Sequence, residues 1–135
     1  MERFSISSTV KEYPALPYES IKNNILGKNY QLSLVFIGPV KAKKLNKESR
    51  GKDYVPNVLS FPLTEEAGEI FITPDTAKTE AKRFKLSEKG YIGYLFIHGL
   101  MHLKGFEHSD KMERLEQKFM TQFKLQWRFL VKDET

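Results

Sequence analysis

The spacing of hydrophobic and polar positions along the first half of the chain predicts a helix, a strand and a second helix. Residues 18–27, YESIKNNILG, have an amphipathic pattern that ends at a glycine, which is typical of a short helix and its stop. Residues 31–37, QLSLVFI, are rich in apolar and β-favouring residues and predict a strand. Residues 38–49 have Ala, Leu and Lys at helical spacing, and residues 50–56 break that pattern.

Two short strands are expected in the middle of the chain. Residues 57–62, NVLSFP, and residues 68–73, GEIFIT, both have strand composition. The polar residues 63–67, LTEEA, separate them by a distance of hairpin length. This arrangement predicts a β-hairpin.

Helical signals return after the hairpin and again at the end of the chain. Residues 73–75, Thr-Pro-Asp, offer a capping hydroxyl, a proline for the first helical position and an acid at the positive end of the dipole. They predict a helix that continues over residues 75–84. Asp110 and Glu113 have the spacing of a cap and third residue, and they predict a long helix through residue 127.

The most apolar helix is predicted over residues 88–104, EKGYIGYLFIHGLMHLK, with Ser87 as its cap and Gly105 as its stop. Positions 91–103 contain no charged residue, so this helix is expected to be buried on several sides and to lie at the centre of the domain. A glycine costs about 1 kcal/mol relative to alanine inside an exposed helix. Close approach of another element or of a ligand is therefore expected at Gly90, Gly93 and Gly99.

The order of these elements mixes helices and strands without strict alternation, which indicates an α+β fold. A length of 135 residues predicts one domain over residues 1–135. The beginning of the chain has no apolar core of signal-peptide length, and the longest apolar stretch is too short to span a bilayer. We therefore expect a cytoplasmic protein without a membrane partner.

The composition limits which metal ligands and which kinds of partner are possible. There is no cysteine, so disulfides and thiolate metal sites are excluded, and a transition metal would need histidine or carboxylate ligands. The net charge of +5 favours an anionic partner, with nucleic acid as the first candidate and a membrane surface as the second.

All three histidines of the chain lie within residues 98–108, HGLMHLKGFEH. His98 and His102 are four residues apart, so their side chains share one face of the predicted helix and can bind one ion. Gly105 allows the chain to turn back, and His108 can then supply a third ligand. Three protein ligands leave a fourth position for water, which is the arrangement of catalytic zinc sites.

Other interpretations of these residues stay open. Each histidine could be a buried polar side chain with satisfied hydrogen bonds, although an apolar helix offers few partners. The metalloprotease motif HExxH has a glutamate where this chain has Gly99, so protease chemistry of that kind lacks its general base. Glu107 could serve as a base, as a partner that orients a ligand, or as a solvated loop acid.

Two segments of the sequence resemble the motifs of a known protein family. HGLMHLKGFEH resembles the HGxLHLxGxDH motif of the YbeY family of bacterial endoribonucleases, and LNKESRGKDYVPNVLSFP followed by GEIFI is similar to that family's LNxxyRxkDxpTDVLSFP…GDI segment. Together the two matches cover about residues 45–108. The resemblance implies a single α+β domain with a small mixed sheet beside a buried helix that carries metal ligands. It also implies metal-dependent cleavage of single-stranded RNA in ribosomal RNA maturation and ribosome quality control.

Carried over by position, the family's metal ligands fall on His98, His102 and His108, and its functional arginine falls on Arg50. Three residues depart from the family pattern, which has aspartate, aspartate and tyrosine where this chain has Asn57, Glu107 and Ser49. Asn57 lacks a charge that would orient Arg50 or a neighbouring loop.

The resulting hypothesis is a single divalent ion, with zinc as the first candidate, that polarises a phosphate oxygen or activates water. Arg50 would act as the catalytic phosphate clamp and, with Lys52, would bind the RNA; the alternative is a surface arginine in a basic loop. The base would be Glu107 or the water on the metal itself.

Tyr54 or Phe106 could stack on unpaired bases or belong to the core. A basic run could follow the RNA backbone or form a solvated face, and it consists of Lys41, Lys43, Lys44, Lys47, Arg50 and Lys52.

Three functions compete at this point. The first is a zinc-dependent endoribonuclease whose partners are single-stranded or ribosomal RNA and ribosomal subunit proteins, but not DNA. The second is a ribosome-associated RNA-binding factor whose metal is mainly structural. The third is a metal hydrolase of a substrate that is not a nucleic acid. Charge and Arg50 favour the first over the third.

Overall fold

The computed structural model describes residues 3–125, which contain a mixed sheet and five helices. The strands are β1 (Phe4–Ser8), β2 (Gln31–Phe36), β3 (Val58–Thr64) and β4 (Ala67–Ile72). The helices are α1 (Tyr18–Leu26), α2 (Pro39–Arg50), α3 (Pro74–Arg83), α4 (Glu88–Lys104) and α5 (Asp110–Gln122). The α+β class and the small mixed sheet expected from the sequence are confirmed.

The sheet has the order β1-β2-β4-β3, with β1, β2 and β4 parallel and β3 antiparallel to β4. The hairpin predicted between β3 and β4 is confirmed, but its link is shorter than the sequence indicated. Leu63 and Thr64 extend β3, and Ala67 already belongs to β4. The register shifts between Pro62 and Thr64. A proline has no N–H to give to the ladder, so it is tolerated where the pairing is irregular.

Strand β1 was not predicted from the sequence. It pairs in parallel with β2 from Phe4 opposite Leu32 to Ser8 opposite Phe36. It lies at the edge of the sheet, and most of its residues are exposed. Its short, mostly polar sequence carries little strand signal because the pairing partner, rather than its own burial, holds it in place.

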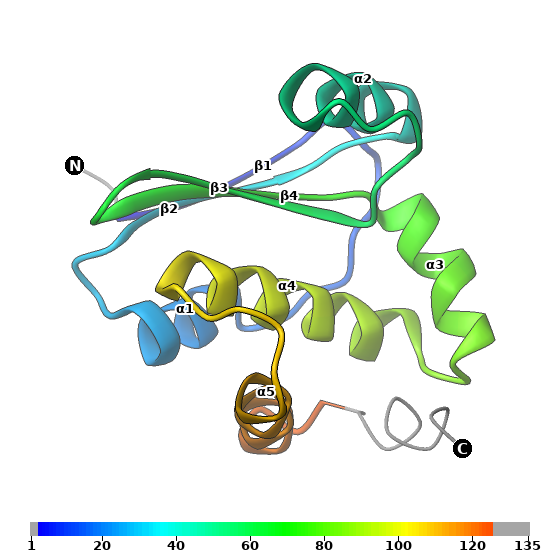
Figure 1. The fold of residues 1–135 in the computed structure, drawn as a ribbon. Helices are drawn as coiled ribbons and strands as arrows, with labels where there is room; N and C mark the ends of the chain where they lie inside the picture. The colour runs from blue at the N-terminus through cyan, green and yellow to red at the C-terminus, as the bar shows by residue number, and fades with distance from the viewer. Residues whose placement is uncertain (1–2, 126–135) are drawn as a thin grey trace.

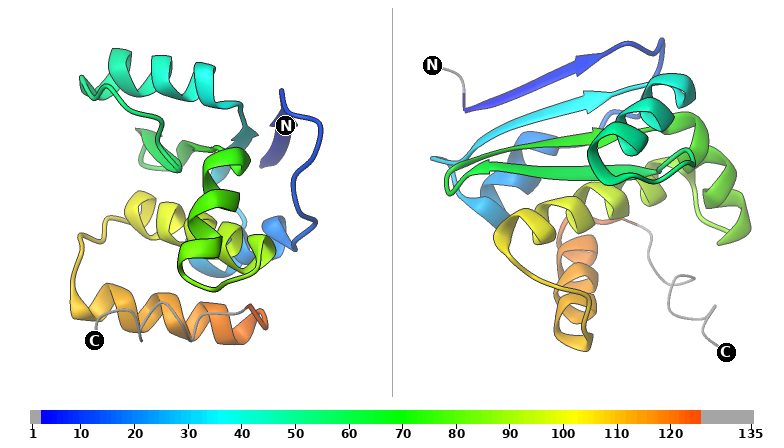
Figure 2. Two further views of the ribbon diagram at one scale, coloured as in Figure 1. Left: turned by 90° about the vertical axis from the view of Figure 1, so that its right-hand side faces the viewer. Right: turned by 45° about the horizontal axis from the view of Figure 1, so that its top comes forward.

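Helices cover both faces of the sheet (Figure 1). α1 and α4 lie along one face, and α2 lies over one end of the other face. α5 lies on the far side of α4 from the sheet, so α4 is sandwiched between the sheet and another helix (Figure 2). This layered arrangement explains why α4 has no polar face.

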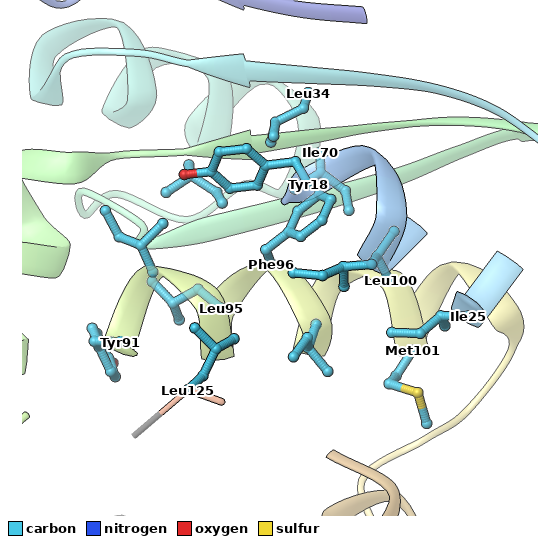
Figure 3. Packing of buried hydrophobic residues seen from close by; sticks show 14 of the residues in the cluster. Tyr18, Ile25, Leu34, Ile70, Tyr91, Leu95, Phe96, Leu100, Met101 and Leu125 are labelled. Carbon is cyan, nitrogen blue, oxygen red and sulfur yellow. The ribbon is translucent and has the colours of Figure 1, made fainter. Parts of the chain in front are cut away.

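The core forms around α4, as the uncharged stretch predicted. Phe96 and Leu100 point from α4 toward Leu34 and Ile70 of the sheet, while Met101 points to the opposite side (Figure 3). Phe96 and Leu100 are fully buried. None of the helices within residues 3–125, α4 included, is long and apolar enough to cross a membrane.

Two glycines of α4 allow the close approaches that the sequence predicted. A Cβ on Gly99 would lie 2.9 Å from Ser60 Oγ and 3.1 Å from Ile70 Cδ1. A Cβ on Gly93 would lie 2.6 Å from Leu125 Cδ1. The neighbours of these glycines are therefore protein elements, the sheet at Gly99 and the segment after α5 at Gly93.

The helix ends agree with the sequence in part. Ser87 Oγ accepts from Gly90 N at 2.9 Å, and Gly105 has a left-handed φ of 106°, so both boundaries of α4 are confirmed. The side chain of Thr73 makes no capping hydrogen bond.

The boundaries predicted for α5 need correction. Ser109, rather than Asp110, caps α5 by accepting from Met112 N. α5 ends at Gln122, and residues 126–127 of the predicted helix lie outside the described residues.

Candidate metal centre

The three histidines converge on one point. His98 and His102 are one turn apart on α4, and His108 returns to them after the left-handed turn at Gly105. The ring centroids are 4.5 Å apart for His98 and His102, 5.0 Å for His98 and His108, and 4.9 Å for His102 and His108. One nitrogen from each ring lies within 4.8 Å of the others, so the trio could hold a metal ion.

The hydrogen bonds of the first two rings fix which nitrogen faces this point. His102 Nδ1 lies 3.0 Å from the carbonyl oxygen of Phe106, which can only accept, so Nδ1 carries the proton. His98 Nδ1 lies 2.6 Å from Glu116 Oε2 and donates to that carboxylate. Both Nε2 atoms therefore present lone pairs, and they lie 3.0 Å apart.

Two facing lone pairs cannot form a hydrogen bond with each other, so the Nε2 atoms of His98 and His102 do not satisfy one another. A shared proton is disfavoured because burial, reinforced by the neighbouring His98, lowers the pKa of His102. A shared cation satisfies both nitrogens, and two nitrogens on one tetrahedral zinc are about 3.3 Å apart. The residues present thus fit a divalent ion, and imidazole nitrogens suit zinc, copper, nickel and iron alike.

Glu116 is a site residue that sequence reasoning missed. It belongs to α5, and it is only 4% exposed. Met112 and Met120, four residues before and after it, are buried as well, so Glu116 is a carboxylate on the apolar stripe of its helix. A charged residue on the apolar stripe of a helix is rare unless it has a partner, and this feature of the sequence could have identified Glu116. By accepting the Nδ1 proton, Glu116 orients the His98 ring.

Replacing Glu116 with glutamine is expected to weaken zinc binding by about 10- to 100-fold, because His98 loses the carboxylate that fixes its tautomer and raises its basicity. Competition against a chromophoric chelator measures this affinity. Glu113→Gln, on the same helix, is the matched control and is expected to bind zinc as the unmodified protein does. Equal affinities for both variants would refute this role of Glu116.

Arg50 lies at the same site. It is the last residue of α2, where the sequence had suggested a loop, and Gly51 follows it with a left-handed φ of 68°. Its Nη1 lies 3.4 Å from Asn46 Oδ1, and its side chain lines the cavity that the three histidines also line. The exposed side chains of Lys52 and Glu107 are not among those that line it.

The cavity has a volume of about 690 Å³ and lies between α4, α5, β3 and the end of α2. Glu113 and Glu116 are the carboxylates that line it within the described part of the chain. Its wall along α4 is aromatic, with Tyr91 and Tyr94. Burial raises the pKa of both tyrosines well above the ordinary value, so their hydroxyls stay neutral.

Asn57 also lines the cavity, but its partners differ from the sequence-based expectation. Its amide donates to Glu80 Oε1 at 2.9 Å and lies 3.5 Å from the Tyr91 hydroxyl. Tyr91 donates to the same Glu80 oxygen at 2.9 Å. An aspartate at this position would place two carboxylates together. The neutral amide of Asn57 thus fits Glu80, and neither of these two contacts reaches Arg50.

The metal-free protein is expected to lose stability as the pH falls below about 6.5, because His102 takes up a proton more readily in the unfolded chain than in the folded one. The pKa of His102 is lower in the folded protein than in the unfolded chain. The free energy of unfolding is therefore highest at a pH above the unfolded pKa, and it declines as the pH falls toward the folded pKa. Thermal midpoints in chelator between pH 7.5 and 5.5 test it. His102→Gln should show a shallower decline, and an equal decline would contradict the assignment.

A family model described as Endoribonuclease YbeY matches residues 4–125. Endoribonuclease YbeY of Finegoldia magna is 38% identical over 94 residues, covering 64% of this chain and 61% of that protein. Endoribonuclease YbeY of Mesoplasma florum is 33% identical over 116 residues, covering 78% of this chain and 66% of that protein. The chain thus spans less than two thirds of the length of these relatives.

One solved structure is similar in fold. The solution structure of TM1509 from Thermotoga maritima matches with a TM-score of 0.64 and 23% sequence identity, over 86% of this chain and 85% of that one. This level of similarity establishes a shared fold for the sheet and its helices.

Proposed function

Because the chain belongs to the YbeY family of endoribonucleases, we propose that it is a metal-dependent endoribonuclease that cleaves single-stranded RNA. The observation that carries the proposal is the meeting of three histidine nitrogens and Arg50 at one cavity. The ring nitrogens offer a cation site, and the guanidinium offers a phosphate site beside it.

His98, His102 and His108 would hold the ion, which we propose to be zinc. When bound, such an ion acts as a Lewis acid toward a phosphate oxygen and lowers the pKa of a coordinated water. The protein prepares the site by holding both Nδ1 protons on acceptors, Glu116 for His98 and the Phe106 carbonyl for His102. Their Nε2 lone pairs are thereby directed to the ion without a tautomer change.

Arg50 would bind the phosphate next to the scissile bond. Its planar guanidinium matches two phosphate oxygens at once and keeps its charge at any working pH. The position at the end of α2 supports this role, because it places the Arg50 side chain in the lining of the cavity that the three histidines share. Lys52 lies two residues further along the chain and is exposed; we propose that it contributes charge to RNA binding outside the cavity.

The charge of α2 supports RNA as the substrate. Its lysines at positions 41, 43, 44 and 47 are exposed and lead along the helix to Arg50. A strand of RNA that follows them would release counterions, so its affinity should fall steeply with salt. This charge distribution favours RNA over an uncharged substrate of a metal hydrolase.

The biological setting follows from the family. We propose that the protein acts in the cytoplasm on ribosomal RNA, in maturation and quality control, and that ribosomal subunit proteins are partners. A ribosome-associated factor with a structural metal is the alternative. Turnover separates the two, because a binding factor with the same site would retain RNA without cleaving it.

The test is cleavage of end-labelled RNA, single-stranded and duplex, by zinc-loaded protein with and without a chelator. We expect cleavage of the single strand that the chelator abolishes and that added zinc restores. A His102→Ala protein purified in parallel controls for contaminating nucleases. Tight binding of the RNA without metal-dependent cleavage would favour the binding factor.

A further inference from the structure

A row of aromatic rings runs along α4 toward the histidines and has no part in the proposed metal and phosphate chemistry. The Tyr91 and Tyr94 rings are nearly parallel, with centroids 6.0 Å apart and an interplanar angle of 23°. The Tyr94 ring lies 5.6 Å from the His98 ring. Phe84 extends the row at the far end, 5.7 Å from Tyr91. All four rings line the same cavity.

The rest of this end of the cavity is apolar with a few polar groups. Leu95 and Met120 line it and are nearly fully buried, while Gln117 offers an amide and Glu113 and Glu116 offer carboxylates. A volume of about 690 Å³ is within the range of pockets that bind small organic groups, which combine an apolar lining with a few polar contacts. The histidine end is suited to a phosphate, and the aromatic end is suited to a flat ring.

We propose that the aromatic end of the cavity binds the unpaired base of the nucleotide whose phosphate lies at the histidines, with the Tyr94 ring as its stacking surface. The proposal rests on the proposed function, since it assigns the substrate's base to the same site. It makes Tyr94 a specificity-determining residue for single-stranded RNA.

Tyr94 fits this role better than its neighbours in the row. It is half-buried and adjacent to His98, so a base on its ring stays within one nucleotide of the metal site. Tyr91 is 4% exposed, and its hydroxyl already donates to Glu80. Tyr54 is exposed and lies outside the cavity lining, and the Phe106 ring lies beneath Lys111.

The pocket would give the enzyme its preference for unpaired RNA. A base in a duplex is stacked on both sides and paired along its edge, so it must leave the helix before it can enter. That extrusion costs a few kcal/mol, and an unpaired base avoids it. The proposed metal site would act on the phosphate, a group that single strands and duplexes share.

The experiment compares two oligomers, a short oligoadenylate and an abasic ribose-phosphate oligomer of equal length, for binding to the zinc-loaded protein by fluorescence polarisation. Stacking on an aromatic side chain is worth about 5- to 150-fold in affinity per base. We expect the unmodified protein to prefer oligoadenylate by at least the lower figure. Tyr94→Leu should lose this preference and bind the abasic oligomer unchanged, while Tyr94→Phe, which keeps the ring, should retain it.

Equal binding of the two oligomers by the unmodified protein would overturn the proposal, and this result requires no variant to fold. An equal loss of both oligomers in Tyr94→Leu would also overturn it, since the residue would then be structural. Cleavage is measured on the same samples. A base preference without cleavage would leave the base pocket standing and reject the endoribonuclease function, so the two ideas fail separately.

Discussion

Replacing His102 with alanine is expected to remove the bound metal and to lower the rate of RNA cleavage by about a thousandfold or more. His102 provides one nitrogen of the trio, with its Nε2 3.0 Å from that of His98. Metal ions contribute several kcal/mol to hydrolytic reactions, which corresponds to a rate effect of this size. Metal analysis and single-turnover cleavage on the same preparation give both values.

The control for this variant is Lys89→Ala, which changes an exposed residue in the first turn of the same helix. It should retain metal and activity. His102→Ala is expected to fold, because His102 is only partly buried. A His102→Ala protein that keeps a full complement of zinc would show that the ion binds elsewhere.

Replacing Arg50 with alanine is expected to slow cleavage by about 100- to 1,000-fold and to leave the metal content unchanged. Removal of one preorganised group that stabilises transition-state charge has an effect of this size. Arg50 lines the cavity beside the histidines but belongs to a different helix, so it can act on the phosphate without holding the ion.

Arg50→Lys should recover only part of the rate, because an ammonium group is a point charge and cannot match two phosphate oxygens at once. Single-turnover cleavage and zinc content are measured for both variants. If Arg50→Ala lost zinc together with activity, the residue would have a structural role at the site. If it kept full activity, the phosphate clamp would be wrong.

The parts of this protein that could be predicted from sequence are those with strong local signals. α4 combines an uncharged stretch with Ser87 at its start and Gly105 at its end, and both ends were confirmed because they depend on nearby residues. The histidine cluster depends on the helical period and one glycine turn, which are local as well. The helical spacing and the glycine turn therefore led us to expect that His98, His102 and His108 converge, and the structure brings them together.

The parts that could not be predicted depend on contacts between distant segments. β1 is an exposed edge strand, and its partner β2 lies beyond α1 in the chain. Glu116 reaches His98 from another helix, 18 residues away in sequence. The aromatic wall of Tyr91 and Tyr94 resembles ordinary core packing in the sequence. The two tyrosines line a cavity because α5 and β3 supply other parts of its wall, and the sequence does not show this arrangement.

The central claim is that three imidazole nitrogens share one ion. X-ray absorption at the zinc edge, measured on protein loaded with one equivalent of zinc, tests this directly. We predict a shell of nitrogen and oxygen neighbours at about 2.0–2.1 Å with the multiple-scattering pattern of about three imidazoles. A shell of oxygen ligands alone, or with a single imidazole, would contradict the shared site and with it the proposed nuclease chemistry.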